Sequence, residues 1–340
     1  RNLEMRLTRH LPWETLPMSK PRKARGREVD GIVILDKPSG QTSNDALQRL
    51  KRMFGAAKAG HTGALDPLAT GVLPICFGEA TKYSQYLLDA DKAYEVTAKL
   101  GVRTASGDSE GEVLDTRPVL NISQESVESV LPRFRGLIQQ VPSMYSALKH
   151  QGQPLYKLAR QGVEIERQAR PVQIYHLEMT HFCDDEFKLS VRCSKGTYIR
   201  TLGEDIGAAL GCGAHLVFLR RLDTGGIGVQ RCLTLEQLQA LDDDARLARL
   251  EPPDVLLADH ARVTLDNDNA GRFLSGMRRR GRWEDAAAVA VYGDQPRVLL
   301  GVGHVQGGEL IPDRLLSPLE IQQIIETLPR ATACGPTEAP

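Results

Sequence analysis

The chain has 340 residues, of which 41% are hydrophobic and 25% are charged, and its 43 basic residues balance 43 acidic ones to a formal net charge of +0. This composition is typical of a globular protein with about two domains and argues against an intrinsically disordered chain. Electrical neutrality gives no sign of nucleic-acid binding, although a neutral total can conceal a basic face. No apolar run approaches the ~20 residues of a membrane-spanning helix, so we expect no membrane segment.

The first predicted element is a flexible basic leader over residues 1–27. Within it, residues 1–17 are interpreted as an extension that is not native, because Met18 resembles a natural start. A continuous apolar run then predicts a buried strand at 31–36. After this strand, Ser43 or Asn44 is expected to cap a helix, and the plainer interpretation of Thr42 and Ser43 is likewise that of cap residues.

Hydrophobic periodicity and turn residues predict the further elements of the larger part of the chain. A segment rich in Lys, Arg, Gln and Tyr at 143–170 interrupts them, and its composition alone indicates a polar, mobile excursion. Expected helices are 79–88, 125–131, 155–161 and 198–210, and expected strands are 72–77, 92–100, 172–182, 187–193 and 214–222.

The pair Pro252-Pro253 indicates a domain boundary. Beyond it, short apolar runs at 287–291, 298–303 and 309–312 are separated by glycines and polar turns. This pattern predicts a small β domain after the boundary. The tail at 331–340 is expected to be disordered.

The six cysteines form no C-x-x-C pair, which argues against a zinc knuckle or a thioredoxin-type site. Several of them lie in apolar segments and are expected to be small buried side chains, as in proteins of the reducing cytoplasm. No nucleotide-binding glycine loop or haem motif is visible. We therefore expect a cytoplasmic protein without a metal or another cofactor.

The segment 60–71, with the sequence GHTGALDPLATG, carries the first candidate for chemistry. Its three glycines and Pro67 disfavour a helix or a regular strand, and the apolar run that follows enters the core. Asp66 is therefore expected on a stiff loop anchored to a rigid element, where catalytic groups tend to lie. On spacing alone, an Asp-Pro pair that merely starts a turn is the favoured interpretation at this point.

Three stretches in the same order identify the chain as resembling the TruB family of pseudouridine synthases. HTGALDPLATG resembles the catalytic motif of that family, KPSGQTS at 37–43 resembles its KPxGxTS motif, and CSKGTYIRTL at 193–202 resembles its third motif. The resemblance extends from about Val29 to about Ser317, and the stretch at 142–149 is similar to bacterial members rather than to the dyskerin relatives.

The resemblance implies a fold and a domain organisation. We expect an α+β catalytic domain with a mixed sheet at 28–252, followed by a small C-terminal β-barrel of the PUA-like type at 255–325 that binds RNA. The excursion at about 143–170 corresponds to an insertion that clamps an RNA stem-loop. The implied activity is isomerisation of uridine to pseudouridine at position 55 in the T loop of tRNA.

The resemblance also implies roles for individual residues. Asp66 corresponds to the nucleophile, and Arg200 to the arginine that pairs with it. Tyr94 corresponds to a tyrosine that stacks on the target base, and His61 to a histidine that enters the T loop beside the flipped base. A second pocket tyrosine, an apolar wall and a source of positive potential are expected at Tyr198, Leu219 and Lys82.

Some of these residues, and the basic clusters, also have purely structural interpretations. Without the motif, Arg200 is as typical of a surface salt bridge, and Tyr94 fits a half-buried strand aromatic. The basic clusters at 20–27, 220–221 and 278–282 are each typical of solvated surface.

Two other functions are alternatives for the whole chain. An RNA-binding or RNA-folding protein with dispensable chemistry is disfavoured by the intact set Asp66, Tyr94 and Arg200, although assistance with tRNA folding is compatible with catalysis. A base-releasing glycosidase lacks an assignable second carboxylate. We expect the T stem-loop of tRNA as partner, no obligate protein partner, no membrane contact and a monomer.

Overall fold

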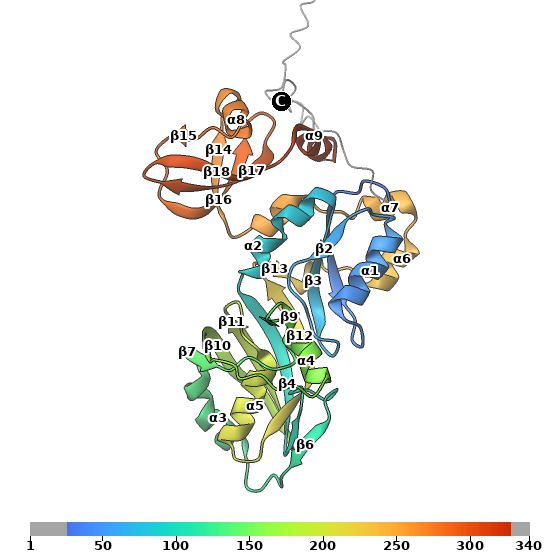
Figure 1. Ribbon diagram of the computed structural model, residues 1–340, viewed down its shortest axis with the longest axis vertical. Helices are drawn as coiled ribbons and strands as arrows, with labels where there is room; N and C mark the ends of the chain where they lie inside the picture. Colours follow the sequence, from blue (N-terminus) through green and yellow to red (C-terminus); the bar gives the residue numbers. More distant parts are fainter. Residues whose placement is uncertain (1–25, 328–340) are drawn as a thin grey trace, which may run out of the picture. The chain divides into compact units, whose positions relative to one another are not determined.

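The computed structural model describes residues 26–327, and these form two compact units, Gly26–Leu256 and the part from Leu257 onward (Figure 1). The expected tail and all but the last two residues of the expected leader lie outside the described residues. Arg27 already belongs to the first unit, because its backbone N–H donates to Gly55 O at 2.9 Å and its guanidinium donates to Asp243. Within the described part no helix is long and apolar enough to cross a membrane.

The first unit is built on a mixed sheet with the strand order β1-β3-β12-β4-β11-β10-β7, to which β2 and β13 add at β3 and β12. All neighbours pair antiparallel except β12 and β3, which run parallel. The expected mixed-sheet α+β class is therefore confirmed. The strands are β1 (Gly31–Lys37), β2 (Ala59–His61), β3 (Thr70–Phe77), β4 (Lys92–Leu100), β7 (Gly136–Gln140), β10 (Arg170–Cys183), β11 (Glu186–Cys193), β12 (Ala214–Thr224) and β13 (Ile227–Gly228).

Shorter strands and helices surround this sheet. Two small hairpins lie outside it, β5 (Val102–Thr104) with β6 (Val113–Thr116) and β8 (Lys149–His150) with β9 (Gln153–Pro154). The helices are α1 (Ser43–Met53), α2 (Ser84–Leu88), α3 (Gln124–Val130), α4 (Leu155–Arg160), α5 (Ile199–Ala209), α6 (Leu235–Ala240) and α7 (Asp243–Leu247), and the 3-10 turns are η1 (Gly78–Tyr83), η2 (Leu131–Phe134), η3 (Val229–Arg231) and η4 (Pro253–Leu257).

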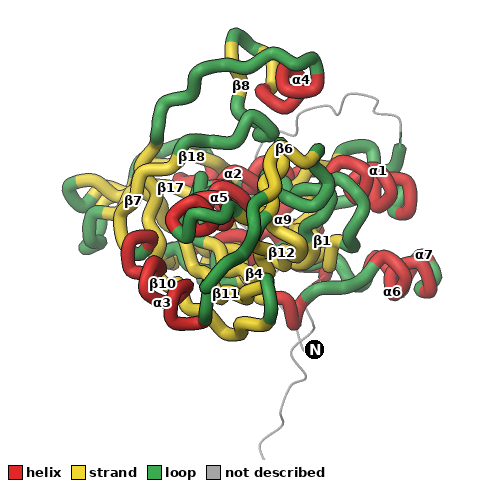
Figure 2. Tube along the Cα trace, turned by 90° about the horizontal axis from the view of Figure 1, so that it is seen from below, coloured by secondary structure: helices red, strands yellow, loops and turns green. Residues whose placement is uncertain are grey.

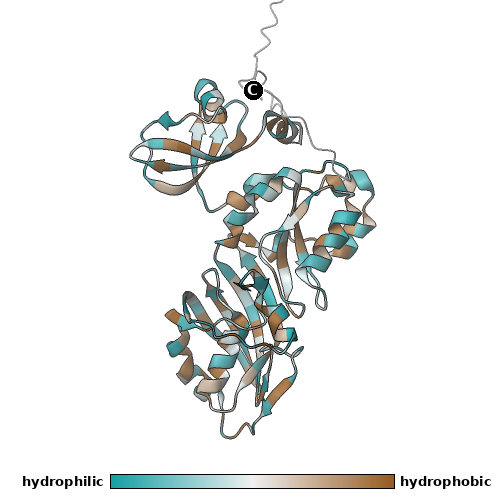
Figure 3. Ribbon diagram, viewed as in Figure 1, coloured by the Kyte–Doolittle hydropathy of each residue, from teal (hydrophilic) through white to brown (hydrophobic). Residues whose placement is uncertain are grey.

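Helix α1 shows how local sequence sets an element. Figure 3 draws it as a mostly hydrophilic helix, and its buried positions include Leu47 and Leu50 on the core side. The prediction of Ser43 or Asn44 as the N-cap is wrong, whereas the interpretation of Thr42 as a cap residue is confirmed. Thr42 is the N-cap, because its hydroxyl and the Asp45 carboxylate satisfy each other's backbone N–H groups in a capping box. This releases Ser43 to point into the core.

The predicted helix at 79–88 is divided in the structure into the 3-10 turn η1 and the short helix α2. The predicted strands 172–182 and 187–193 are confirmed as β10 and β11, which pair antiparallel. The excursion at 143–170 contains the hairpin β8–β9 and helix α4, and Figure 2 shows this part standing away from the sheet.

The second unit contains a five-stranded curled sheet with the order β14-β16-β17-β18-β15. Its edges β14 and β15 do not pair with each other within the described residues, so the expected barrel is an open, curled sheet. Buried alanine and valine side chains of β16 and buried valine and leucine side chains of β17 form much of its core. The elements are β14 (Ala261–Leu265), α8 (Asn267–Leu274), β15 (Arg279–Arg280), β16 (Ala286–Gly293), β17 (Val298–Gln306), β18 (Glu309–Leu315) and α9 (Pro318–Thr327).

Candidate active site

The loop that carries Asp66 joins β2 to β3 along the edge where β3 meets β12. Two of its glycines adopt positive φ, Gly63 at 92° and Gly71 at 99°, which is the backbone region that favours glycine. The Asp66 carbonyl accepts from the Ala69 N–H at 3.0 Å, which closes a turn around Pro67. The turn and the candidate catalytic position are therefore the same feature, and the first does not exclude the second.

The KPSGQTS segment holds this loop from beneath. The Ser43 hydroxyl accepts from the Leu65 N–H at 2.7 Å and donates to the Leu65 carbonyl at 3.1 Å. The Gly40 N–H donates to Pro67 O at 2.9 Å. These contacts fix the backbone on both sides of Asp66. The KPSGQTS motif therefore packs against the HTGALDPLATG motif.

Lys37 is the charged member of the same support, and sequence reasoning did not single it out. Its side chain is fully buried and its ammonium donates to three carbonyl oxygens, those of Pro38, Gln41 and Pro67. Burial lowers the pKa of Lys37 to about 8, against an opposing contribution from the Asp66 carboxylate. A lysine at the end of a buried strand was the available signal in the sequence.

Arg200 and Asp66 meet across the site. Arg200 Nε lies 2.9 Å from Asp66 Oδ2, and Nη2 donates to Asp66 Oδ1 at 3.1 Å. One guanidinium edge therefore holds both carboxylate oxygens, as the planar fork of arginine allows. The expected pairing is present in the structure, and the interpretation of Arg200 as a surface salt bridge is wrong, because its side chain is 6% exposed.

The rest of the Arg200 guanidinium is also engaged. Nη1 donates to Ser106 O at 2.6 Å and Nη2 donates to Tyr145 O at 2.8 Å. Asp108 Oδ2 lies 3.8 Å from Nη1, and the Ser106 hydroxyl and the Glu110 N–H donate to Oδ1 of the same carboxylate. Sequence reasoning did not single out Asp108, which is a buried counter-charge behind Arg200.

The protonation of Asp66 reflects opposing influences. Burial raises the pKa of the Asp66 carboxyl, the Arg200 guanidinium lowers it, and the Asp108 charge raises it again. The net direction is upward from the ordinary value of 3.8. Because 38% of the side chain remains exposed, hydration further supports the charged form in the free protein. A closed complex that removes this water depends more strongly on Arg200.

Tyr94 and Leu219 line one face of the sheet beside the loop. In the antiparallel pairing of β4 and β12, Tyr94 lies opposite Arg221 and Val96 lies opposite Leu219. Directly opposed residues project from the same face. All four are buried, and burial raises the pKa of Tyr94 to about 12. Tyr94 is therefore a neutral phenol at physiological pH.

Tyr198 and His61 occupy other parts of the site. Tyr198 is the N-cap of α5, and Gln140 bonds both its backbone N–H and its carbonyl, at 3.0 and 3.3 Å. Burial raises the pKa of the Tyr198 phenol, and the Asp66 charge contributes in the same direction. His61 ends β2, and burial together with Arg221 lowers the pKa of its imidazole. His61 Nδ1 is buried without a hydrogen-bond partner among the described residues.

Lys82 forms an ion pair with Glu79 on η1. The cations that act on the pKa of Asp66 are Arg200 first and Lys37 after it. The positive potential expected of Lys82 stays a prediction.

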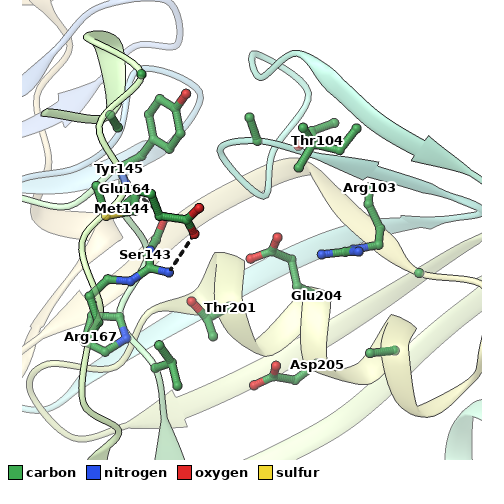
Figure 4. Close-up of a pocket in the computed structure, with 18 of the residues that line it drawn as sticks. Arg103, Thr104, Ser143, Met144, Tyr145, Glu164, Arg167, Thr201, Glu204 and Asp205 are labelled. Carbon is green, nitrogen blue, oxygen red and sulfur yellow. Dashed lines mark hydrogen bonds and ion pairs between the residues drawn. The ribbon is translucent and has the colours of Figure 1, made fainter. Parts of the chain in front are cut away.

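An open cleft of about 820 Å³ lies between helix α5 and the excursion at 143–170 (Figure 4). Figure 4 shows Glu204 and Asp205 of α5 and Arg103 of β5 on one side, and Glu164 and Arg167 of the excursion on the other. Burial raises the pKa of Glu204 to about 7, against the lowering influence of Arg103. Within residues 26–327 no group of three His, Cys, Asp or Glu side chains is arranged to hold a metal ion.

Two solved structures of complexes contain a chain with the same fold. A structure described as an H/ACA RNP bound to a substrate RNA containing 2'-deoxyuridine matches 91% of this chain and 94% of the compared chain, with a TM-score of 0.65 and 21% identity. A Cbf5-Nop10-Gar1 complex matches 90% of this chain and 96% of the compared chain, with a TM-score of 0.65 and 23% identity. At 21–23% sequence identity, this structural similarity defines the fold of the chain.

Sequence relatives define the family. A tRNA pseudouridine synthase B from Verminephrobacter eiseniae (strain EF01-2) is 56% identical over 94% of this chain and 98% of its own. Another from Tolumonas auensis (strain DSM 9187 / NBRC 110442 / TA 4) is 59% identical over 88% of this chain and 96% of its own. The chain belongs to the TruB family of pseudouridylate synthases. Family models match the TruB N-terminal domain at 51–199, the tRNA pseudouridylate synthase B C-terminal domain at 200–258 and the pseudouridine synthase II TruB C-terminal region at 261–316.

Proposed function

We propose that this protein isomerises uridine to pseudouridine at position 55 in the T loop of tRNA, in the cytoplasm. The single observation that carries the proposal is that Arg200 Nε and Nη2 hold both oxygens of the Asp66 carboxylate. The loop around Asp66 is in turn fixed by the KPSGQTS segment. The two relatives compared above are named tRNA pseudouridine synthase B, which supports the same substrate class.

The reaction breaks the N1–C1′ bond of uridine, turns the base, and joins C5 to C1′, with the C5 proton released. It needs one ionised carboxylate as nucleophile and involves no net oxidation or reduction. Asp66 fills this role in our proposal, by attack on either C6 of the base or C1′ of the ribose. Its partly exposed carboxylate is accessible to a substrate, whereas Asp108 is buried behind Arg200.

Arg200 holds the carboxylate in one orientation and favours its charged form once substrate has displaced water. Tyr94 is proposed to stack on the target base and to assist in removal of the C5 proton. Leu219 and Tyr198 are proposed to wall the base pocket, which excludes water and protects the intermediate from hydrolysis.

A uridine stacked inside the T loop must be turned out to reach Asp66. We propose that His61 fills the space beside the flipped base. The lowered pKa of His61 keeps its imidazole neutral, which suits insertion among bases. Recognition of this kind uses the shape and splayed bases of RNA.

Two regions are proposed to hold the rest of the RNA. The excursion at 143–170 is proposed to clamp the stem-loop, and its Tyr145 carbonyl bonds Arg200 directly. The second unit is proposed as a PUA-like RNA-binding domain. Of its predicted arginine group, Arg278 and Arg280 pair with Glu309, so these two charges are partly neutralised.

A different pair of arginines in that unit is open to a phosphate. Arg262 and Arg297 each place a guanidinium over the ring of Tyr292, at 5.8 and 5.7 Å from its centroid. Both arginines are exposed and neither has an acidic partner among the described residues. We name these three residues the Tyr292 cluster and propose it as a phosphate contact of the second unit.

The protein is proposed to act as a monomer without an obligate protein partner and to be capable of assisting tRNA folding. The two solved structures with the same fold are complexes of the compared chain with other molecules.

The test is to map pseudouridine in unmodified tRNA before and after incubation with the full chain. We expect conversion at position 55 by the wild type, and no conversion by Asp66→Asn, which should bind tRNA within about threefold of wild type because many other groups hold the RNA. Equal turnover by Asp66→Asn would remove Asp66 from the role of nucleophile. Binding without conversion by the wild type would favour an RNA-binding protein, and release of free uracil would favour a glycosidase.

A further inference from the structure

A buried arginine without an acidic partner lies directly behind the Asp66 loop. Arg221 of β12 is 1% exposed and is the largest fully buried side chain of the described residues. It forms no ion pair within that part of the chain, whereas its neighbour Arg220 donates to Asp36 at 2.6 Å. Burial of an unpaired charge is strongly unfavourable. Its presence in this core therefore indicates a role beyond packing.

The hydrogen bonds of Arg221 reach both ends of the segment that carries Asp66. Its Nε donates to Val72 O at 2.7 Å, and its Nη2 donates to Gly63 O at 3.4 Å. Gly63 lies three residues before Asp66 and Val72 lies six residues after it. A single rigid group thus ties the two ends of the loop to strand β12.

The two flanking glycines of the loop also meet Arg221. Gly71 is in register with Arg221 in the parallel pairing of β3 and β12, and a Cβ on Gly71 would lie 2.1 Å from the Arg221 carbonyl oxygen. A Cβ on Gly63 would lie 3.9 Å from Arg221 Nη1. Gly71 must therefore lack a side chain for β12 to approach, while Gly63 leaves the guanidinium close beneath the loop.

Arg221 also acts on the residues that face the substrate. It lies opposite Tyr94 on the same face of the sheet, and its charge opposes the effect of burial on the pKa of the Tyr94 phenol. Its charge also lowers the pKa of His61. One guanidinium is therefore within electrostatic reach of the proposed base-stacking tyrosine and the proposed base-flipping histidine.

We infer that Arg221 is a positioning residue for the isomerisation: it fixes both ends of the Asp66 loop and holds the Tyr94 hydroxyl beside it. The inference rests on the proposed function. It assigns a role to a residue of the 220–221 cluster, for which the sequence indicated solvated surface. Arg220 fits that expectation more closely, since it is partly exposed and paired.

The adjacent arginine provides a matched control. Arg221→Lys keeps the charge but cannot reach Val72 O and Gly63 O at once, whereas Arg220→Lys keeps an ion pair with Asp36 in reach. In single-turnover reactions at saturating enzyme, we expect Arg221→Lys to lose about 30-fold or more in rate, the scale on which misplacement of reacting groups is felt. Arg220→Lys should stay within about threefold, since lysine keeps the positive charge that faces Asp36 and Arg220 makes no contact with the Asp66 carboxylate. The Kd for tRNA should change little in both.

A second variant separates positioning from general support of the core. Arg221→Ala leaves a space the size of the lost guanidinium. Added guanidinium ion at about 20–50 mM, well below denaturing levels, should restore at least about tenfold in single-turnover rate by occupying that space. Methylammonium at the same concentration should restore little, because it has no planar fork.

Each outcome decides the inference. A wild type that forms no pseudouridine would overturn the proposed function itself. With an active wild type, equal rates for Arg221→Lys and Arg220→Lys would overturn the positioning role alone. Failure of both Arg221 variants to fold, shown by circular dichroism, would assign Arg221 to core stability and overturn the inference as well.

Discussion

The Arg200–Asp66 contact allows a quantitative prediction for Arg200→Lys. Arg200 reaches both Asp66 oxygens, at 2.9 and 3.1 Å, and also bonds the carbonyls of Ser106 and Tyr145. A lysine ammonium can replace one contact to Asp66 but cannot hold both oxygens in a plane. Loss of one hydrogen bond to a charged group is worth about 1.5–3 kcal/mol. At about 1.4 kcal/mol per tenfold, this corresponds to a rate loss of about 10- to 150-fold.

The assay is single-turnover pseudouridine formation at saturating enzyme. We expect a loss of about 100-fold for Arg200→Lys, with tRNA binding changed much less, because displacement of a reacting group costs this much. Arg249→Lys, at an exposed position, is the matched control and should be unchanged. Circular dichroism verifies the fold of both variants.

A pH series then separates charge from geometry. The pKa of Asp66 is raised by burial, and Arg200 is the main group that lowers it. If lysine opposes burial less well, the pKa rises further, the ionised fraction at neutral pH falls, and the rate recovers as pH increases. A defect that does not vary with pH would assign Arg200 to geometry. A near-wild-type rate at neutral pH would refute both roles.

Three further predictions follow from single contacts. Ser43→Ala should lower the free energy of unfolding by about 1–3 kcal/mol and slow turnover, because it leaves the Leu65 N–H unpaired. The control Ser39→Ala, at an exposed position, should change neither quantity. Equal effects of the two variants in a denaturant titration would contradict this prediction. Glu204→Gln should stabilise the protein by about 1–2 kcal/mol at pH 8 and much less at pH 5. The reason is that the pKa of Glu204 in the folded protein, about 7, exceeds its ordinary value of 4.5. The wild type therefore loses stability as pH rises from about 4.5 to 7, and glutamine, which does not ionise, avoids this loss. Glu112→Gln is its exposed control, and a melting-temperature gain independent of pH would refute the assignment. Replacing both arginines of the Tyr292 cluster with glutamine should weaken tRNA binding and reduce its salt dependence by about two phosphate contacts, with the bound-state rate unchanged.

Much of the first unit could be predicted from the sequence because its signals are local. Apolar runs and alternation gave strands that the structure places as β1, β3, β4 and β12, and the glycines at 211 and 213 follow the predicted helix α5 directly. The Asp66 loop followed from Gly and Pro chemistry within a few residues. The cap of α1 stayed open among neighbouring residues in the sequence, because Thr42 and Ser43 are equally good caps locally and a contact to distant Leu65 decides between them.

The active-site pairing itself followed from family motifs rather than from physics. Asp66 and Arg200 are 134 residues apart, and no local pattern states that they meet. Asp108 and Lys37 were missed for the same reason, since each is distinguished by burial near a distant charge. A turn aspartate and a strand-end lysine have ordinary sequence surroundings.

By itself, the sequence determined the main strands and helices of the first unit, the stiff loop and the family. The tertiary structure alone decided which charges are buried and what they contact. Arg220 and Arg221 show the difference most clearly, because adjacent residues of a strand point to opposite faces. One face of β12 leaves Arg220 partly exposed beside Asp36, and the other buries Arg221 behind the Asp66 loop. The environment of each face depends on which strands pair with β12, and that pairing is set by contacts far apart in the chain.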